Sequence, residues 1–196
     1  HKKSKRIALI FSVGGVNRGA SDVDPLSGSR SMGSDSVTAG FRAAIADKDV
    51  KAIVFRVDSP GGSYVASDAI WREVVRAKQA GKPVIVSMGN VAGSGGYFVA
   101  MAADKIVAQP GTITGSIGVL GGKLVPTGLL EKVGVSLDQV HFGKNALMFS
   151  QTADYSEDEW KRFQSWLDRV YSDFTTKVAQ GRKLEPAKVL QIAKGR

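Results

Sequence analysis

Three short apolar runs constrain the fold of this chain more than any other feature. Residues 7–13 (IALIFSV), 52–57 (AIVFRV) and 83–88 (PVIVSM) are almost continuous in apolar residues. Runs of this length without polar alternation are typical of parallel strands buried on both faces. Shorter runs predict two further strands, at 105–108 and 137–142. We therefore expect a sheet with parallel strands.

Segments of helical character separate these runs. Asp35 is placed to cap a helix that ends at Ile45, and residues 65–80 repeat apolar residues at helical spacing. Residues 94–103 predict a buried helix, and 129–133 a short one. Strands that alternate with helices predict an α/β fold, in which sites form at the carboxyl ends of the strands.

The C-terminal part of the chain carries the longest helical pattern. Ser156 and Glu159 have the spacing of a capping box at a helix N-terminus. The apolar stripe that follows consists of Trp160, Phe163, Leu167, Val170, Phe174 and Val178. Such a stripe predicts a face that packs on its own domain or on a partner subunit. Residues 17–34, rich in Gly, Ser and Asp, predict a mobile loop instead.

The net charge of +9 is concentrated at the chain ends. Residues 1–6 and 179–196 carry +4 each, which leaves +1 for residues 7–178. A nucleic-acid groove needs cations on one folded face, so this distribution argues against that class of partner. Solvated tails and an anionic membrane surface near the ends are the two interpretations. We expect 1–6 to be a basic tail or linker and 7–196 a single domain, a fragment of a longer chain.

Composition excludes several kinds of site. The chain has no cysteine, which excludes disulfides, thiolate nucleophiles and Cys-type zinc sites. Its only histidines are His1 and His141, so we expect no metal site. Residues 93–98 lack the last glycine of a dinucleotide motif and no P-loop is present, so we expect no cofactor. No run of 18 apolar residues is present, so no membrane span is predicted.

The segment 91–97 (VAGSGGY) is the most informative for chemistry. Ser94 lies between a predicted strand and a predicted helix, with glycines on both sides. A tight turn exposes the hydroxyl, and a helix N-terminus stabilises developing negative charge, as a nucleophile requires. The alternative is a glycine-rich helix start in which the Ser94 hydroxyl satisfies backbone donors.

A second glycine turn, 59–62 (SPGG), follows another predicted strand. Two successive glycines can direct N–H groups into a cleft. Together with the Gly95 N–H, they would form an oxyanion hole worth roughly 3–4 kcal/mol per donor. The alternative is an ordinary turn that leads into a capped helix.

Three ordered blocks carry a family resemblance: 57–63 (VDSPGGS), 93–97 (GSGGY) and 112–118 (TITGSIG). Together they resemble the signature blocks of signal peptide peptidase A (protease IV), and the resemblance extends from residue 7 to 196. Gly93 departs from the family, whose members usually have alanine there. The resemblance implies a Clp protease/crotonase-like spiral of β-β-α units, with the long amphipathic helix at its C-terminal end.

The resemblance also implies a serine–lysine dyad peptidase. It assigns Ser94 as the nucleophile, Ser116 as the residue that holds the lysine, and Gly61, Gly62 and Gly95 to the oxyanion. Implied substrates are cleaved signal peptides and other apolar membrane peptides. A homo-oligomer is implied as well, at the bacterial cell membrane, with the catalytic domain on the extracytoplasmic side.

The base lysine is missing from its family position. In half-length members it lies three residues after a glycine equivalent to Gly143, where this chain has Ala146. Lys144 is a candidate two residues earlier, although it also fits a surface lysine, and His141 is a serine–histidine alternative. Double-length members carry the lysine in the first domain and the serine in the second. This chain resembles the second, so we expect an N-terminal domain of the same protein to supply the base.

Two other interpretations compete with the peptidase. A crotonase-like enzyme acting on acyl-thioesters would use the same oxyanion geometry without a serine nucleophile. A catalytically silent structural half would leave Ser94 unused.

Overall fold

The computed structural model describes residues 5–194, whose contacts divide the chain into two compact units. The first combines the chain up to Gly118 with the chain from Asp173 onward, and the second is 119–172. Helix α5 (Glu157–Arg182) contributes residues to both. The single domain expected over 7–196 stays a prediction. Residues 1–4 of the predicted basic tail lie outside the described residues.

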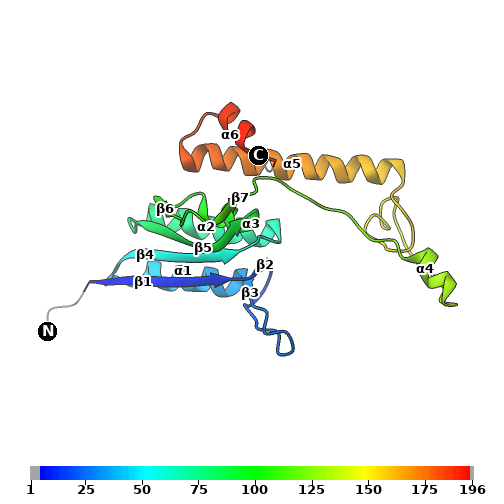
Figure 1. The fold of residues 1–196 in the computed structure, drawn as a ribbon, viewed down its shortest axis with the longest axis horizontal. Helices are drawn as coiled ribbons and strands as arrows, with labels where there is room; N and C mark the ends of the chain where they lie inside the picture. Colours follow the sequence, from blue (N-terminus) through cyan, green and yellow to red (C-terminus); the bar gives the residue numbers. More distant parts are fainter. Residues whose placement is uncertain (1–4, 195–196) are drawn as a thin grey trace. The chain divides into compact units, whose positions relative to one another are not determined.

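A parallel sheet forms the centre of the first unit (Figure 1). Its strands run in the order β1-β4-β5-β6, and β7 pairs with β5. Their bounds are β1 (Arg6–Val13), β4 (Val50–Ser59), β5 (Val84–Gly93), β6 (Lys105–Val107) and β7 (Ile113–Gly115). Every pairing within the sheet is parallel, which confirms the predicted sheet type and four of the five predicted strands.

Helices α1 (Ser34–Ala46) and α2 (Tyr64–Gln79) pack against one face of this sheet. The alternate β4 residues Ile53, Phe55 and Val57 are fully buried in the same core as these helices, and the ring of Phe55 meets that of Phe41 edge-on at 5.0 Å. The cap predicted at Asp35 is wrong. Gly33 caps α1 without a side-chain hydrogen bond, and Asp35 lies in the first turn.

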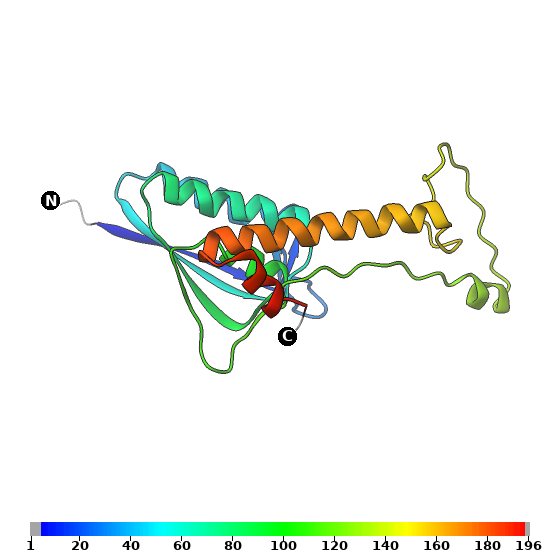
Figure 2. The ribbon, with the colours of Figure 1, turned by 90° about the horizontal axis from the view of Figure 1, so that it is seen from above.

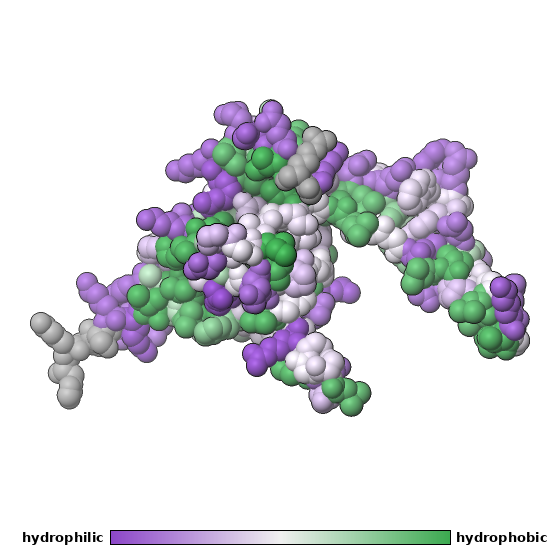
Figure 3. All heavy atoms as spheres, in the orientation of Figure 1, coloured by the Kyte–Doolittle hydropathy of each residue, from purple (hydrophilic) through white to green (hydrophobic). Residues whose placement is uncertain are grey.

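The prediction that 7–13 is buried on both faces is wrong for β1. Ile7, Leu9 and Phe11 are 66%, 56% and 65% exposed, and Figure 3 shows hydrophobic residues at the surface where this strand lies, among hydrophilic ones. β1 is an edge strand, and α1 packs against it. The apolar run therefore predicted the position of the strand correctly, but it did not predict that one row of its side chains is exposed.

The segment predicted as a loop at 17–34 contains regular structure. Strand β2 (Gly15–Asn17) pairs in parallel with β3 (Ser31–Gly33), and Val23 forms an antiparallel bridge with Arg30. The carboxylate of Asp24 accepts the backbone N–H groups at 26 and 27. These side-chain contacts order a stretch that has little apolar surface to bury.

Helix α5 begins where the sequence predicts. Ser156 N donates to Glu159 Oε2 at 2.8 Å, and Glu159 N donates to Ser156 Oγ at 3.3 Å, which confirms the capping box. Of the predicted stripe, Phe163, Val170, Phe174 and Val178 are buried. Two shorter helices are α4 (Thr127–Lys132) and α6 (Pro186–Ile192). None of the helices described is both long and apolar enough to cross a membrane.

The strand predicted at 137–142 is wrong. These residues form no strand in the second unit, and Val140 and Phe142 are fully exposed. Within the described part of 119–172 there is no other strand for this segment to pair with. An isolated strand leaves its backbone hydrogen bonds unmade, so apolar composition alone did not produce one.

Candidate active site

Ser94 lies at the junction of β5 and helix α3 (Gly95–Ala100), at the carboxyl end of a central strand. Its backbone has φ 49° and ψ −119°, a conformation that residues other than glycine rarely adopt. Such backbones cost on the order of 1–3 kcal/mol, so the surroundings must hold them in place. Here Ser94 N donates to Gly115 O at 2.9 Å, and Ser94 O accepts from Phe98 N at 2.8 Å.

The Ser94 side chain does not cap the helix that it begins. The residue is half-buried, and its hydroxyl makes no capping hydrogen bond to α3. A serine cap is worth about 0.5–2 kcal/mol, and this helix forgoes it. The interpretation of Ser94 as a capping residue is therefore wrong, and its hydroxyl stays available for other contacts.

The two predicted glycine turns touch each other beside Ser94. Gly61 has φ +106°, and a Cβ built there would lie 2.7 Å from Gly95 N and 2.8 Å from Ser94 Cβ. A Cβ on Gly95 would lie 3.1 Å from Gly62 N and 2.6 Å from Ser67 Oγ. No side chain fits into this approach, so the backbones of the two turns meet directly.

The amides at this junction differ in their partners. Gly61 N donates to Ser59 Oγ at 3.2 Å, so this N–H is already used. Within residues 5–194, no backbone acceptor outside the helices and strands receives the N–H of Gly62 or of Gly95. Gly95 is the first residue of α3 and has no acceptor within that helix either. Two of the three predicted oxyanion groups thus keep free donors.

Val16 of β2 holds the 61–62 turn, and the sequence analysis missed it. Val16 N donates to Gly61 O at 2.8 Å, and Val16 O accepts from Ser63 N at 2.7 Å. A Cβ on Gly62 would lie 2.3 Å from Val16 O, so this pairing requires glycine. Val16 is fully buried. A lone apolar residue between two glycines and a polar loop was the signal available in the sequence.

Ser116 lies close to the same strand end. It follows β7 directly, with φ 47°, and its Cβ is 3.6 Å from where a Gly93 Cβ would lie. The preceding residue, Gly115, accepts the Ser94 N–H. The structure thus brings Ser94, Ser116 and the two glycine turns together, while the lysine-holding role of Ser116 stays a prediction.

The two base candidates in the chain, Lys144 and His141, belong to the second unit. Lys144 Nζ pairs with Asp158 Oδ2 at 2.5 Å, and this hydrogen bond lowers the pKa of the Asp158 carboxyl. His141 is exposed, on a segment without regular structure. A general base must present a neutral amine, whereas an ammonium held by a carboxylate is the protonated form.

A half-buried charged cluster joins α5 to α2, and it too was missed from the sequence. Lys177 Nζ pairs with Asp68 at 2.7 Å and with Asp173 at 2.6 Å, and it lies 4.4 Å from the Trp71 ring centroid. Figure 2 shows this end of α5 alongside α2. Tyr64, the first residue of α2, donates to Asp173 at 2.7 Å.

Burial shifts the titration of this cluster. Burial disfavours the Asp68 carboxylate, but hydrogen bonds from Lys177 and Arg72 outweigh it and lower the Asp68 pKa. Burial, together with the Asp173 carboxylate, raises the pKa of Tyr64. Tyr64, a member of this cluster, lies two residues after Gly62 and begins α2. The cluster therefore holds in place the helix that follows the 61–62 turn.

Comparisons with known proteins identify relatives of this chain. The chain is 40% identical to "Protease 4" of Salmonella typhi over 189 residues, which is 96% of this chain and 29% of that protein. It is 38% identical to "Putative signal peptide peptidase SppA" of Enterococcus faecium over 150 residues, 76% of this chain and 44% of that protein. The chain therefore spans less than half the length of either relative.

The fold comparison confirms the Clp protease-like architecture. A ClpP1 mutant from Listeria monocytogenes aligns with a TM-score of 0.52 at 14% identity. The alignment covers 93% of this chain and 77% of that one. Residues 76–196, which include Ser94, Gly95 and Ser116, match the profile of Peptidase family S49. The chain belongs to Peptidase family S49.

Proposed function

We propose that this chain is the nucleophile-bearing part of a serine peptidase of the serine–lysine dyad type, with Ser94 as the attacking residue. One observation carries the proposal. Ser94 is half-buried on a strained turn, and its hydroxyl makes no capping hydrogen bond. It lies beside the free N–H groups of Gly62 and Gly95. A nucleophile and two amide donors around one carbonyl position are what acyl transfer requires.

The proposed reaction proceeds in two steps. A neutral lysine amine takes the Ser94 proton while Oγ attacks the peptide carbonyl carbon. The carbonyl oxygen becomes an oxyanion that accepts from Gly62 N–H and Gly95 N–H. The ammonium then protonates the leaving amine as the C–N bond breaks. Water activated by the same amine hydrolyses the acyl-enzyme, which frees the new carboxylate and restores Ser94.

The base lysine comes from an N-terminal domain of the same protein in this proposal. Two observations support this. Lys144 already forms an ion pair with Asp158, and the chain spans less than half the length of its relatives, which leaves room for a further domain in them. A catalytic lysine needs a desolvated site, whereas the Lys144 side chain is 78% exposed. Ser116, close to the strand end that carries Ser94, would hold the incoming ammonium.

The proposed substrates are cleaved signal peptides and other apolar membrane peptides. The name of the Enterococcus faecium relative, "Putative signal peptide peptidase SppA", supports this class. Peptides would bind extended, as an added strand along the glycine turns. We place the protein at the bacterial cell membrane as a homo-oligomer, with the catalytic domain on the extracytoplasmic side.

The decisive experiment combines a fluorophosphonate probe with a peptide amidase assay. Both are applied to this chain alone, and to the full-length protein with its N-terminal half. We expect the chain alone to be weakly active, and the full-length protein to be active and labelled at Ser94. Ser94→Ala should remove both signals, whereas Ser165→Ala, at an exposed serine of α5, should change neither.

Each competing interpretation has its own outcome in this experiment. An unlabelled Ser94 together with turnover of acyl-thioesters would favour the crotonase-like enzyme. Full peptidase activity in Ser94→Ala would favour a catalytically silent half. Full activity of the isolated chain, lost in Lys144→Ala, would overturn the proposal that another domain supplies the base.

A further inference from the structure

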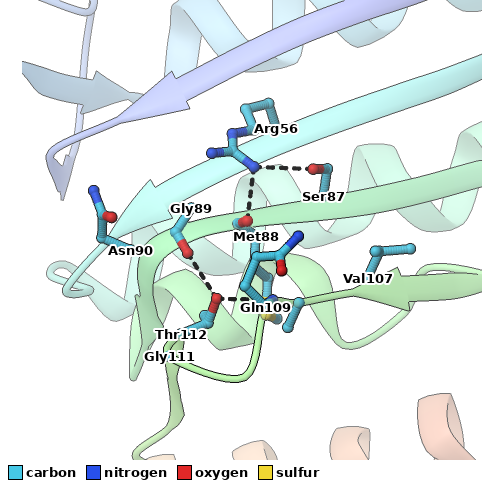
Figure 4. Close-up of a pocket in the computed structure, with 10 residues that line it drawn as sticks. Arg56, Ser87, Met88, Gly89, Asn90, Val107, Gln109, Gly111 and Thr112 are labelled. Atoms are coloured by element: carbon cyan, nitrogen blue, oxygen red, sulfur yellow. Dashed lines mark hydrogen bonds between the residues drawn. The ribbon is translucent and has the colours of Figure 1, made fainter.

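A polar pocket of about 370 Å³ lies in the first unit, apart from the Ser94 turn (Figure 4). Its walls come from β4, β5 and the segment 107–112, which begins at the last residue of β6. They include Arg56, Ser87, Asn90, Gln109, Gly111 and Thr112. The volume is at the small end of ligand pockets, which span roughly 300–1,000 Å³. No aspartate or glutamate lines the pocket, so it does not suit a cation.

Arg56 is held in a fixed orientation at this pocket. Its Nη1 donates to Ser87 Oγ at 3.0 Å and to Met88 O at 2.7 Å, and Figure 4 shows both bonds leaving one nitrogen. Nη1 carries two hydrogens, so both are used. Among residues 5–194, no acceptor receives the N–H groups of Nε and Nη2. That free edge of the guanidinium matches the two oxygens of a carboxylate.

The charge of Arg56 has no counter-ion in the described part of the chain. Arg42, Arg72 and Arg76 each pair with a carboxylate, and Arg56 pairs with none. Asp58, two residues along the strand, accepts instead from Asn90 Nδ2 at 3.2 Å and from Val91 N at 3.1 Å. A half-buried, preoriented guanidinium without an anion has lost hydration that a bound anion would replace.

The opposite wall is ordered as well. Thr112 Oγ1 donates to Gly89 O at 2.9 Å and accepts from Gln109 N at 3.1 Å. These bonds tie the 107–112 segment to β5. The side-chain amides of Asn90 and Gln109 add neutral hydrogen-bonding groups, and Val107, 54% exposed, adds an apolar contact. Such a mixture suits a peptide end better than a bare inorganic ion.

We infer that this pocket binds the C-terminal carboxylate of a short peptide, with Arg56 as the bidentate partner. Asn90, the lining residue of β5 nearest to Ser94, precedes it by four residues, about 13 Å at roughly 3.3 Å per residue, and neither glycine turn lines the pocket, so the pocket is a separate site. A peptide's terminal carboxylate carries the planar charge that the free guanidinium edge recognises. The inference does not depend on the role proposed for Ser94.

Isothermal titration of the 196-residue chain tests the inference. The probes are N-acetylated Ala-Leu-Ala as the free acid, the same peptide as its C-terminal amide, and an acetylated Ala-Asp-Ala amide. We expect the free acid to bind at least tenfold more tightly than either amide. Arg56→Gln should weaken it at least tenfold. Arg18→Gln removes the same charge from an exposed arginine and should leave binding unchanged, as should Ser94→Ala.

A second variant guards against a folding defect in Arg56→Gln, which loses two hydrogen bonds to β5. Gly111 lines the pocket, and a Cβ there meets no atom within 4 Å, so Gly111→Trp adds a bulky side chain at the pocket wall without a backbone clash while Arg56 stays intact. It should abolish binding of the free acid without lowering the thermal midpoint. Equal binding of acid and amide, preference for the aspartyl peptide, tighter binding of inorganic phosphate, or unchanged binding in Gly111→Trp would each overturn the inference.

Discussion

Two glycine-bearing regions of the chain look alike in composition and differ in their contacts. At Gly61 and Gly95 of the first unit, an added Cβ would lie under 3 Å from backbone or side-chain atoms. At Gly122 and Gly128 of the second unit, it would meet nothing within 4 Å. Close approach of neighbouring atoms is therefore what requires glycine at 61 and 95, and glycine content alone does not indicate it.

The lysines of the two units show the same contrast. Lys177 and Lys144 both pair with aspartates, at 2.6–2.7 Å and at 2.5 Å. Their side chains are 12% and 78% exposed. From the sequence, Lys144 was a candidate for the base, whereas no role was predicted for Lys177. Similar ion-pair distances thus conceal different environments, and the environment decides how much each pair contributes to stability.

The largest effect that separates the two units should come from these lysines. Lys177→Met leaves Asp173 and Asp68 without a shared cation whose side chain is only 12% exposed, so we expect a loss of about 3 kcal/mol in the free energy of unfolding. Lys144→Met removes an exposed pair and should cost less than about 1 kcal/mol. Urea denaturation of both variants measures the difference. Equal losses would show that the burial contrast has no energetic consequence.

Adding one methyl group to a glycine of each region tests the contrast between them. Gly61→Ala forces a Cβ to within 2.8 Å of Ser94 Cβ at φ +106°, and so displaces the proposed nucleophile. We expect kcat/KM of the full-length peptidase to fall by at least about 100-fold. Gly128→Ala, in open space on α4, should leave kcat/KM unchanged. A Gly61→Ala enzyme with full activity would refute the close-approach argument.

Two serines at helix starts sharpen the comparison. Ser156 caps α5 through its hydroxyl, and Ser94 precedes α3 without a cap. Ser156→Ala should therefore cost about 1 kcal/mol in the free energy of unfolding. Ser94→Ala should change it by less than about 0.5 kcal/mol. Chemical denaturation of both variants decides, and a large loss in Ser94→Ala would point to a structural role for this hydroxyl.

The smallest expected effect is the pH dependence of the Asp68 contacts. The Asp68 pKa is depressed in the folded state, so its contribution is complete above the unfolded value, about 3.9. It is lost as the pH falls through the lower folded value. The stability difference between wild type and Asp68→Asn should be constant from pH 7 to 5 and shrink below about pH 4. Urea denaturation at these pH values measures it, and a difference that grew on acidification would contradict the assignment.

Local patterns predicted much of the fold. Continuous apolar runs located four strands of the sheet, helical spacing located α2 and α5, and the capping box located the start of α5. The same reasoning failed for 137–142 and for the outer face of β1. Periodicity reports which residues are apolar, whereas pairing and burial depend on which other segments are available to cover them.

The sequence by itself determined the parallel α/β architecture, the order of the glycine turns and the position of a serine between a strand and a helix. Only the tertiary structure decided that Val16 clamps the 61–62 turn, that the free amides of Gly62 and Gly95 lie beside one another, and that Lys177 pairs with Asp68 of α2. The physical reason is separation along the chain. Val16 and the 61–62 turn, Gly62 and Gly95, and Lys177 and Asp68 are each separated by tens of residues, and local propensity carries no information about such contacts.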